Sequence, residues 1–342
     1  MEGPLEGHHH EAYAVRLGAD SPFRSRFEWL KLREPRDGIF WYDSRCFRSE
    51  EALLEILRKH QVPRVPEVLR VDEKVSVHSF IVGETLGARS PGSGQVATRH
   101  LDQIEELFRS LAVFDVRALN GLKRVCDHEA MSWRDDSYGF LVRLIEDSVD
   151  KIHASQGGKY DRLFHDLGVP DDALDHFKRD LVPLTPRPYR LLHGDLHREN
   201  FIIDEADDLW TIDWELARIG DPLYDLATHL HLMHYDAEQE YEMTKRWQNT
   251  VESVLPDAVK GVEADLPQYL AYKRIQSVYT DIIRGAEAVR RSPGGTAAAR
   301  AVESVRRALT AASKQLDLRV LSLDEIDCVL GRYIGQSSVT EG

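Results

Sequence analysis

The residues best suited to chemistry lie in one segment, His193–Asn200, with the sequence HGDLHREN. His193, Asp195 and Asn200 have the spacing His-x-Asp-x-x-x-x-Asn, which in a kinase catalytic loop supplies a base and a metal ligand. Asp213, in the segment TIDWE, follows Asn200 by thirteen positions and offers a second metal-binding oxygen. Phosphoryl transfer needs one carboxylate to orient the attacking hydroxyl and oxygen ligands to hold Mg²⁺ on the nucleotide phosphates. The set therefore predicts a phosphotransferase site.

Each of these residues also has an ordinary structural role to be weighed. A lone aspartate between a strand and a helix most often caps the helix, but the spacing to Asn200 and Asp213 favours Asp195 as the catalytic base. We expect Asn200 and Asp213 to share the Mg²⁺ ions, and His193 to support the loop. The apolar surroundings of Asp213 agree with a metal partner, because a buried carboxylate without one is costly.

A hydrolytic metal centre is the competing chemistry for this segment. His193, Asp195 and His197 form a His-x-Asp-x-His pattern, which can belong to such a centre. Further ligands at convincing spacing are lacking, and this interpretation leaves Asn200 and Asp213 unexplained. The histidines at 229, 231 and 234 are expected to be core or surface residues rather than ligands.

The elements that would position these residues change character along the chain. The first ninety residues favour strands at 11–17, 26–32 and 74–86 and a short amphipathic helix at 49–60. Helical periodicity follows at 96–114, 138–153, 171–180, 236–254, 265–290 and 297–314, with short strands around the motif at 188–213. This order predicts an α+β, protein-kinase-like bilobal fold. We expect a small β-rich N-terminal nucleotide-binding lobe, residues 1–86, and a large mainly helical C-terminal lobe, residues 87–342.

The small lobe offers candidates for contacts with the nucleotide. Lys31 ends an apolar strand, where a phosphate-binding lysine would lie in a kinase small lobe, and Glu50 opens the next helix as its expected ion-pair partner. A lysine at a strand end is most often simply solvated, so these two residues gain weight only from their order before the loop motif. His9 lies in GHHHEAYAV (7–15), at the place of a nucleotide-covering turn. The histidine run could also be a metal site or a tag remnant; a natural loop near the phosphates is favoured.

The composition and charge of the chain argue against some classes of binding partner. The chain has 342 residues, a formal net charge of −14, 42% hydrophobic and 30% charged residues. This charge argues against nonspecific binding to nucleic acid, since a phosphate backbone would be repelled. No apolar run is long enough for a membrane span, and the N-terminus lacks a signal-peptide pattern. The three cysteines lie far apart and form no metal or redox pair. We therefore expect a cytoplasmic protein; the sequence leaves open whether it is a monomer or a homodimer.

The motif region resembles a known superfamily. LLHGDLHRENFIID (191–204) and TIDWELARIGDPLYDLATHL (211–230) are similar to the aminoglycoside phosphotransferase and choline-kinase-like small-molecule kinases. The resemblance implies Asp195 as base, Asn200 and Asp213 as Mg²⁺ ligands, and Lys31 with Glu50 on the phosphates of ATP or GTP. It also implies that a hinge around Phe80–Val82 receives the purine, and that Asp221 and Asp225 stabilise the loop and the following helix. Arg198-Glu199 departs from the family, in which many members have Pro-Gly there.

The leading hypothesis is an O-phosphotransferase that uses ATP or GTP and Mg²⁺ on a hydroxyl of a small molecule. An antibiotic substrate, of aminoglycoside, nucleoside or similar type, is favoured; a metabolite kinase of choline, homoserine, sugar or fructosamine type is the close alternative. A catalytically silent nucleotide-binding module is disfavoured by the intact motif, and a protein kinase by the lack of an A-P-E segment. Substrate contacts are expected from Arg198, Asp236, Glu240, Tyr279 and Asp281.

Overall fold

The computed structural model describes residues 2–5, 10–35, 45–70, 76–92, 94–125, 135–154, 158–292 and 294–340. These residues form two compact units, one of Met1–Ser137 with Pro186–Val262 and one of Tyr138–Thr185 with Glu263–Gly342. The predicted lobe boundary at residues 86 and 87 falls inside the first unit, so the division into nucleotide-binding and substrate-binding lobes stays a prediction. No helix in these described ranges is both long and apolar enough to cross a membrane.

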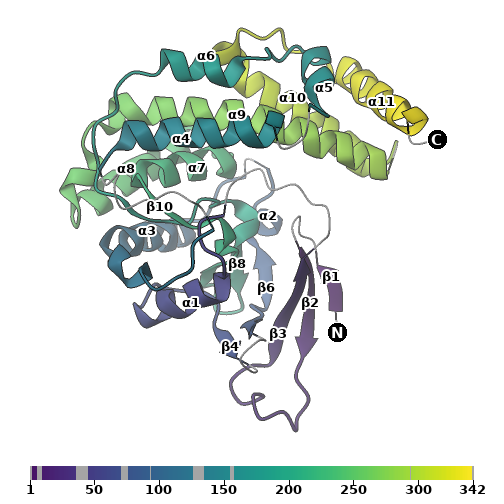
Figure 1. The fold of residues 1–342 in the computed structure, drawn as a ribbon. Helices are drawn as coiled ribbons and strands as arrows, with labels where there is room; N and C mark the ends of the chain where they lie inside the picture. Colours follow the sequence, from purple (N-terminus) through teal and green to yellow (C-terminus); the bar gives the residue numbers. More distant parts are fainter. Residues whose placement is uncertain are drawn as a thin grey trace. The chain divides into compact units, whose positions relative to one another are not determined.

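A five-stranded antiparallel sheet opens the first unit, with the strand order β1-β2-β3-β5-β4. Figure 1 shows its first three strands side by side. The strands are β1 (Glu2–Leu5), β2 (His10–Arg16), β3 (Trp29–Pro35), β4 (Val68–Arg70) and β5 (Ser76–Ser79). The sequence predicts that Lys31 ends its strand, but this lysine is the third residue of β3. It is paired with Ala14 on one side and with His78 on the other, so it lies in the middle of the sheet rather than at an edge.

Helix α1 (Glu50–Lys59) follows β3 as the sequence predicts. Ser49 caps it, because its side-chain oxygen accepts a hydrogen bond from the backbone N–H of Ala52 at 3.1 Å. Its apolar face buries Leu53, Leu54 and Leu57 completely. The same helical phase buries Glu50 at the first turn, and this sets the direction of its carboxylate.

The strand predicted at 74–86 is two strands in different sheets. β5 ends at Ser79, and β6 (Gly83–Thr85) pairs with β8 (Phe201–Asp204) in a three-stranded sheet completed by β9 (Leu209–Thr211). A Cβ at Gly83 would lie 2.1 Å from the carbonyl oxygen of Ile203, so only glycine permits this close approach. Residues 80–82 therefore connect the two sheets, which is where the sequence places a hinge.

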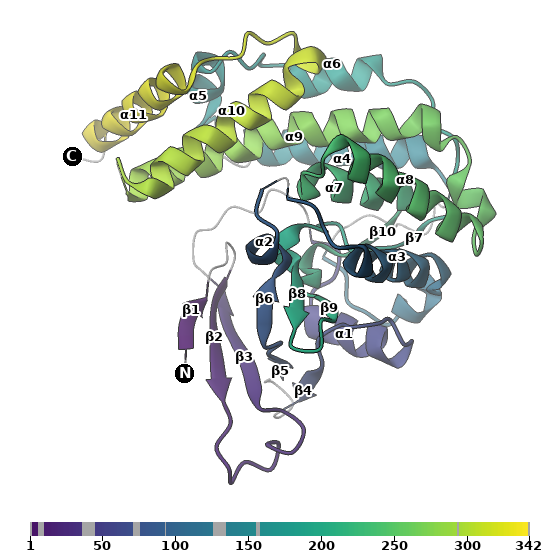
Figure 2. The same cartoon turned by 180° about the vertical axis from the view of Figure 1, so that it is seen from behind.

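The rest of the first unit is mainly helical. Figure 2 shows α2 and α3 beside the β6-β8-β9 sheet. A two-stranded sheet pairs β7 (Arg190–Leu192) with β10 (Arg218–Gly220). The helices are α2 (Leu86–Arg89), α3 (Thr98–Val113), α7 (Pro222–Met233) and α8 (Ala237–Glu252), with 3-10 turns at Val116–Leu119, Arg198–Asn200, Trp214–Leu216 and Pro256–Val259.

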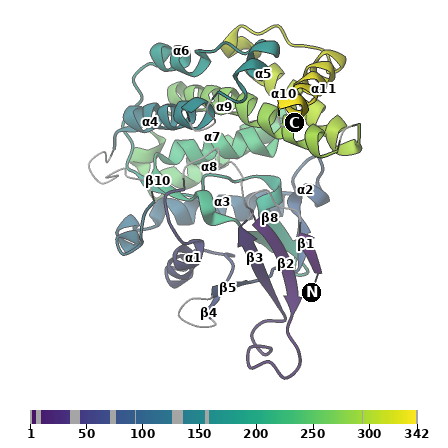
Figure 3. The ribbon, with the colours of Figure 1, turned by 45° about the vertical axis from the view of Figure 1, so that its right-hand side comes forward.

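The second unit is helical throughout its described residues, apart from connecting loops (Figure 3). Its helices are α4 (Ser137–Val149), α5 (Asp161–Asp166), α6 (Ala173–Asp180), α9 (Val262–Arg291), α10 (Thr296–Leu316) and α11 (Leu323–Thr340), with a π-turn at Asp150–Ala154. The predicted helices at 138–153, 171–180, 265–290 and 297–314 are confirmed, whereas the sequence does not predict α5 and α11. The hydroxyls of Ser148 and Tyr272 lie 2.9 Å apart and join α4 to α9 inside the core.

Candidate active site

The predicted catalytic loop begins where β7 ends. Gly194 has φ of 82°, in the left-handed region that favours glycine, and a Cβ there would lie 2.6 Å from the carbonyl oxygen of Leu216. The buried carboxylate of Asp225, on α7, accepts hydrogen bonds from the backbone N–H groups of His193 (2.9 Å) and Gly194 (2.8 Å). Burial raises the pKa of Asp225 to about 6, against the lowering effect of these two bonds. Asp225 thus holds the start of the loop, as the family resemblance implies.

His193 supports the loop as the sequence suggests. Its Nε2 donates to the carbonyl oxygen of Ile212 at 3.0 Å, and its Nδ1 accepts from the backbone N–H of Asp195 at 3.3 Å. These partners require the neutral ring protonated on Nε2. Burial lowers the pKa of His193 to about 4, which keeps the ring neutral at physiological pH.

Asp195 and Asn200 are brought into direct contact. The Asn200 Nδ2 donates to the backbone carbonyl of Asp195 at 2.8 Å and to its carboxylate Oδ2 at 3.2 Å. His197 Nε2 lies 3.4 Å from the same Oδ2, while its Nδ1 accepts from the backbone N–H of Glu199 at 3.2 Å. Burial alone would lower the pKa of His197, but the charges of Asp195, Asp213 and Glu199 raise it overall. The half-buried carboxylate of Asp195 is therefore fixed by an amide on one side and an imidazole on the other.

The β8–β9 hairpin brings Asp213 back to this loop. The backbone N–H of Ile212 donates to the Asn200 carbonyl at 2.9 Å, so Asp213 follows a residue that is hydrogen-bonded to Asn200. From α3, Gln103 holds the hairpin by accepting from the N–H of Leu209 at 2.9 Å. Asp213 itself has φ of 62° and ψ of 65°, a left-handed conformation that is uncommon outside glycine and concentrates at functional sites.

Three carboxylates converge where Asp213 lies. One oxygen from each of Glu50, Asp213 and Glu215 lies within 4.8 Å of the others. Glu50 and Glu215 are buried, and the Glu50 Oε1 accepts a hydrogen bond from the backbone N–H of Trp214 at 2.8 Å. Hard carboxylate oxygens at this spacing suit a divalent cation such as Mg²⁺. Glu215 was missed by the sequence reasoning, although its position two residues after Asp213 in a motif already singled out was the available signal.

Among the remaining nucleotide candidates, the structure places Lys31, Phe80 and Val82 without testing their roles. Lys31 lies half-buried in β3, and its ion pair with Glu50 stays a prediction. Phe80 and Val82 lie between β5 and β6; the Phe80 N–H donates to the Trp29 carbonyl at 3.2 Å, and Val82 is 47% exposed. His9 lies outside the described residues.

The predicted substrate residues of the first unit already have intramolecular contacts. Arg198 is 6% exposed, and each of its three guanidinium nitrogens donates to a backbone carbonyl. These contacts give Arg198 a structural role, and its predicted substrate role draws no support from them. Asp236 caps α8 by accepting from the Gln239 N–H at 2.8 Å. Glu240 lies in the first turn of the same helix.

In the second unit, Tyr279 and Asp281 lie on α9. The ring of Tyr279 is buried and packs edge-on against Phe164, with ring centroids 5.0 Å apart. Asp281 accepts a hydrogen bond from the Ser304 hydroxyl at 3.3 Å, and burial raises its pKa. Both side chains therefore take part in packing α9 within its own unit, and their roles toward a substrate stay predictions.

A buried ion pair supports the helix that carries Asp225. Arg187 Nη1 lies 3.0 Å from Asp221 Oδ2, and both side chains are fully buried. Asp221 also caps α7 by accepting from the N–H of Leu223 at 2.9 Å. Removing one partner from such a pair leaves an uncompensated buried charge, so this contact fixes the start of α7.

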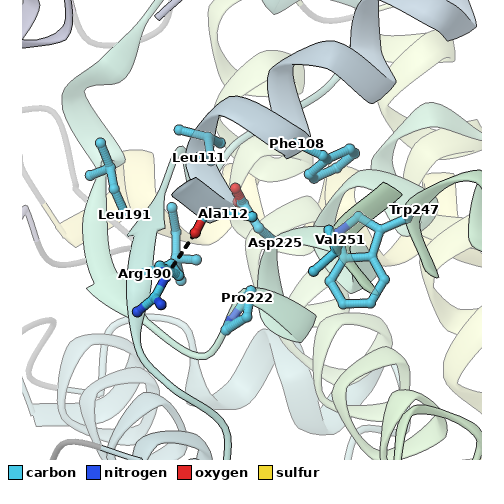
Figure 4. A pocket seen from close by; sticks show the side chains of 10 residues that line it. Phe108, Leu111, Ala112, Arg190, Leu191, Pro222, Asp225, Trp247 and Val251 are labelled. Carbon is cyan, nitrogen blue, oxygen red and sulfur yellow. Dashed lines mark hydrogen bonds between the residues drawn. The ribbon is translucent and has the colours of Figure 1, made fainter. Parts of the chain in front are cut away.

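Beside Asp225 lies a small cavity of about 10 Å³ between β7, α3, α7 and α8. Figure 4 shows its lining, in which Arg190 donates to the carbonyl oxygen of Ala112 at 2.8 Å. The volume is at the lower limit for one water molecule, so this cavity cannot be a nucleotide or substrate site.

Two histidines that are buried and neutral in the folded protein should make the folded state less stable at acid pH. Burial lowers the pKa of His193 to about 4 and that of His229, on α7, to about 3. Both values lie below about 6.5, the pKa of an unfolded histidine, so the unfolded chain binds these protons more strongly. Their contribution to stability is complete above pH 6.5 and is lost as the pH falls toward 4.

We expect each histidine to lower the free energy of unfolding by about 2 kcal/mol between pH 7 and pH 5. Asp225, with its raised pKa, acts in the opposite direction over the same window. Urea unfolding of the wild type and of His229→Gln at both pH values measures the contribution of His229 alone. The loss between pH 7 and pH 5 should be smaller in His229→Gln by about 2 kcal/mol, and equal losses in the two proteins would contradict the assignment.

Comparisons with known proteins establish the family and the fold of the chain. Residues 3–261 match the model of the phosphotransferase enzyme family. A putative aminoglycoside phosphotransferase from Ralstonia eutropha JMP134 has a similar structure, with a TM-score of 0.60 and 15% identity, over 92% of this chain and 90% of that one. Choline kinase from Cryptosporidium parvum Iowa II gives a TM-score of 0.55 and 13% identity, over 94% and 90%.

A thermostable mutant of the aminoglycoside phosphotransferase APH(4)-Ia, in a ternary complex with AMP-PNP and hygromycin B, gives a TM-score of 0.50 and 17% identity, over 90% and 92%. No curated protein sequence matches the chain. These likenesses confirm the predicted α+β, protein-kinase-like fold. With the family model matching most of its length, the chain belongs to the phosphotransferase enzyme family.

Proposed function

We propose that the protein transfers the γ-phosphoryl group of ATP or GTP to a hydroxyl of a small molecule, with Mg²⁺ as the metal. The proposal rests on the contact between Asp195 and Asn200. It rests also on the β8–β9 hairpin, which brings Asp213, just after β9, to the end of the hairpin at which Asn200 precedes β8. A base, an amide oxygen and a carboxylate on adjoining segments are the parts that phosphoryl transfer requires.

In this proposal Asp195 accepts a hydrogen bond from the substrate hydroxyl and takes its proton as the oxygen attacks phosphorus. His197 and Asn200 hold the carboxylate in one orientation, which reduces the entropy lost when the substrate binds. His197, which carries a raised pKa, favours the ionised form of Asp195 before the proton arrives.

Asn200 and Asp213 would hold the magnesium, with Glu215 as a further carboxylate. Bound Mg²⁺ would neutralise charge on the nucleotide phosphates. Lys31, in β3, and His9 would contact the phosphates, and the backbone at Phe80–Val82 would receive the purine. Glu50 would either pair with Lys31 or join the carboxylates of Asp213 and Glu215, whose oxygens it already approaches.

The acceptor belongs to one of two classes, and we favour an antibiotic over a metabolite. The structural neighbours include both an aminoglycoside phosphotransferase in complex with hygromycin B and a choline kinase. Choline and aminoglycosides carry positive charge, and acidic residues at the start of α8, Asp236 and Glu240, would suit such a molecule.

A panel assay tests this function. ADP and GDP release is measured with Mg²⁺ and either nucleotide, in the presence of aminoglycosides, nucleoside antibiotics, choline, ethanolamine, homoserine and sugars. We expect one class to stimulate release, with the phosphorylated product identified by its mass. Stimulation by choline or another metabolite alone would replace the antibiotic proposal. Silence with every acceptor and both nucleotides would contradict the transferase activity itself.

A further inference from the structure

Arg198 connects three segments of the first unit through its guanidinium. Its Nε donates to the carbonyl oxygen of Met233, the last residue of α7, at 2.7 Å. Its Nη1 and Nη2 donate to the carbonyls of Ser90 and Gly94 at 2.6 and 2.8 Å. A helix end and a loop both present carbonyls that have no partner within their own secondary structure, and one arginine satisfies carbonyls of both. The catalytic loop is thereby attached to α7 and to the segment between α2 and α3.

His229 holds the same loop from a second direction. This buried ring lies with Nδ1 3.3 Å from the carbonyl oxygen of Leu196 and with Nε2 3.0 Å from the hydroxyl of Tyr235. A carbonyl can only accept, so Nδ1 carries the proton and Nε2 accepts from Tyr235. The guanidinium carbon of Arg198 lies 5.9 Å from the centroid of the Tyr235 ring, within the range of a cation–π contact. Tyr235 thus touches both residues that hold the loop.

These attachments lie between the two residues that matter for the proposed chemistry. Leu196 directly follows Asp195, and Arg198 precedes Asn200 by two positions. A displacement of Leu196 or Arg198 therefore moves the base or the metal ligand.

We propose that Arg198, His229 and Tyr235 form a loop support that sets the position of Asp195 relative to Asn200. Arg198 is a positioning residue in this network, not a substrate-binding one. The inference rests on the proposed phosphotransferase function for its effect on turnover, but not for its effect on loop order. Catalytic groups must be held within about 0.5 Å of the productive geometry by residues around them. Misplacement by about 1 Å costs on the order of 10²-fold in rate.

The test compares Arg198→Met and Arg198→Lys with a matched control, Arg190→Met. Arg190 is also a partly buried arginine of the first unit that donates to backbone carbonyls, those of Ala112 and Tyr189, both at 2.8 Å. We expect Arg198→Met to lower kcat on the order of 10²-fold with little change in the nucleotide KM. Arg198→Lys keeps the charge but cannot donate to three carbonyls in the fixed geometry of the guanidinium. Its kcat should lie between those of the wild type and Arg198→Met. Arg190→Met should lower Tm but leave kcat near the wild-type value.

Hydrogen exchange gives a readout that needs no acceptor. In Arg198→Met the amides of residues 193–201 and 88–92 should exchange faster than in the wild type, whereas in Arg190→Met they should not. If the wild type shows no turnover but Arg198→Met still loosens these amides, the function proposal fails and the loop support stands. Wild-type exchange in residues 193–201 of Arg198→Met would overturn the loop support. An equal loss of kcat in Arg190→Met and Arg198→Met would overturn it as well, because the effect would then be general destabilisation.

Discussion

Replacing Asp195 by asparagine should lower kcat on the order of 10³-fold while leaving nucleotide binding nearly unchanged. The substitution removes the charge that accepts the substrate proton but keeps a side chain of the same shape. The backbone carbonyl of residue 195 would still accept from Asn200, so the loop should keep its conformation. Turnover is measured with the acceptor found in the panel, and binding of a fluorescent ADP analogue is measured in parallel.

Asp115→Asn is the matched control for Asp195→Asn. This aspartate is half-exposed, caps the 3-10 turn at Val116–Leu119, and pairs with Arg117 at 2.8 Å. The Asp115→Asn substitution removes one negative charge, as Asp195→Asn does, but at a position away from the loop. It should therefore leave kcat near the wild-type value. If Asp195→Asn turned over as fast as the wild type, Asp195 could not be the base. A loss of nucleotide binding equal to the loss of turnover would instead indicate a binding role.

Replacing Asp213 by asparagine should affect metal and nucleotide together. The wild type is expected to bind the ADP analogue more tightly with Mg²⁺ than with EDTA, and this difference should nearly vanish in Asp213→Asn. Loss of an outer residue around a metal typically costs roughly 10- to 100-fold in metal affinity, so loss of a direct ligand should cost at least as much. Titration with Mg²⁺ at fixed nucleotide measures the shift, and kcat should fall with it.

The Glu215→Gln variant tests whether Asp213 or Glu215 is the principal metal ligand. Its carboxylate lies in the same cluster as that of Asp213, so its replacement should also weaken the Mg²⁺ dependence, by a smaller factor if Asp213 is the principal ligand. Equal Mg²⁺ dependence in the wild type and Asp213→Asn would remove Asp213 from the metal site. Retention of the Mg²⁺ effect in Asp213→Asn with its loss in Glu215→Gln would assign the principal ligand to Glu215.

Local sequence was enough to predict the candidate catalytic loop, because the residues that define it lie close together in the chain. Asp195 and Asn200 are five positions apart, and the contact between them at 3.2 Å is made within one tight turn. Asp213 is separated from them only by the β8–β9 hairpin, whose alternating apolar residues and turn were visible in the sequence. The periodicity also indicated α1, α3, α8, α9 and α10, since each has a long apolar face. Short elements such as β6 and α2 could not be distinguished from their neighbours in the sequence, because a few residues carry too little periodicity.

Tertiary structure alone decided what lies around that loop. Glu50 meets Asp213 and Glu215 from a helix more than 150 positions earlier in the chain, a distance over which no spacing rule applies. Arg198 looked like a residue available to a substrate, but burial directs its guanidinium to carbonyls of three separate residues. The sequence by itself determined which residues could do chemistry. The packing of α2 and α7 against the loop, and of α1 against Trp214–Leu216, decided how they are held. Such contacts between distant segments depend on the direction of each buried side chain.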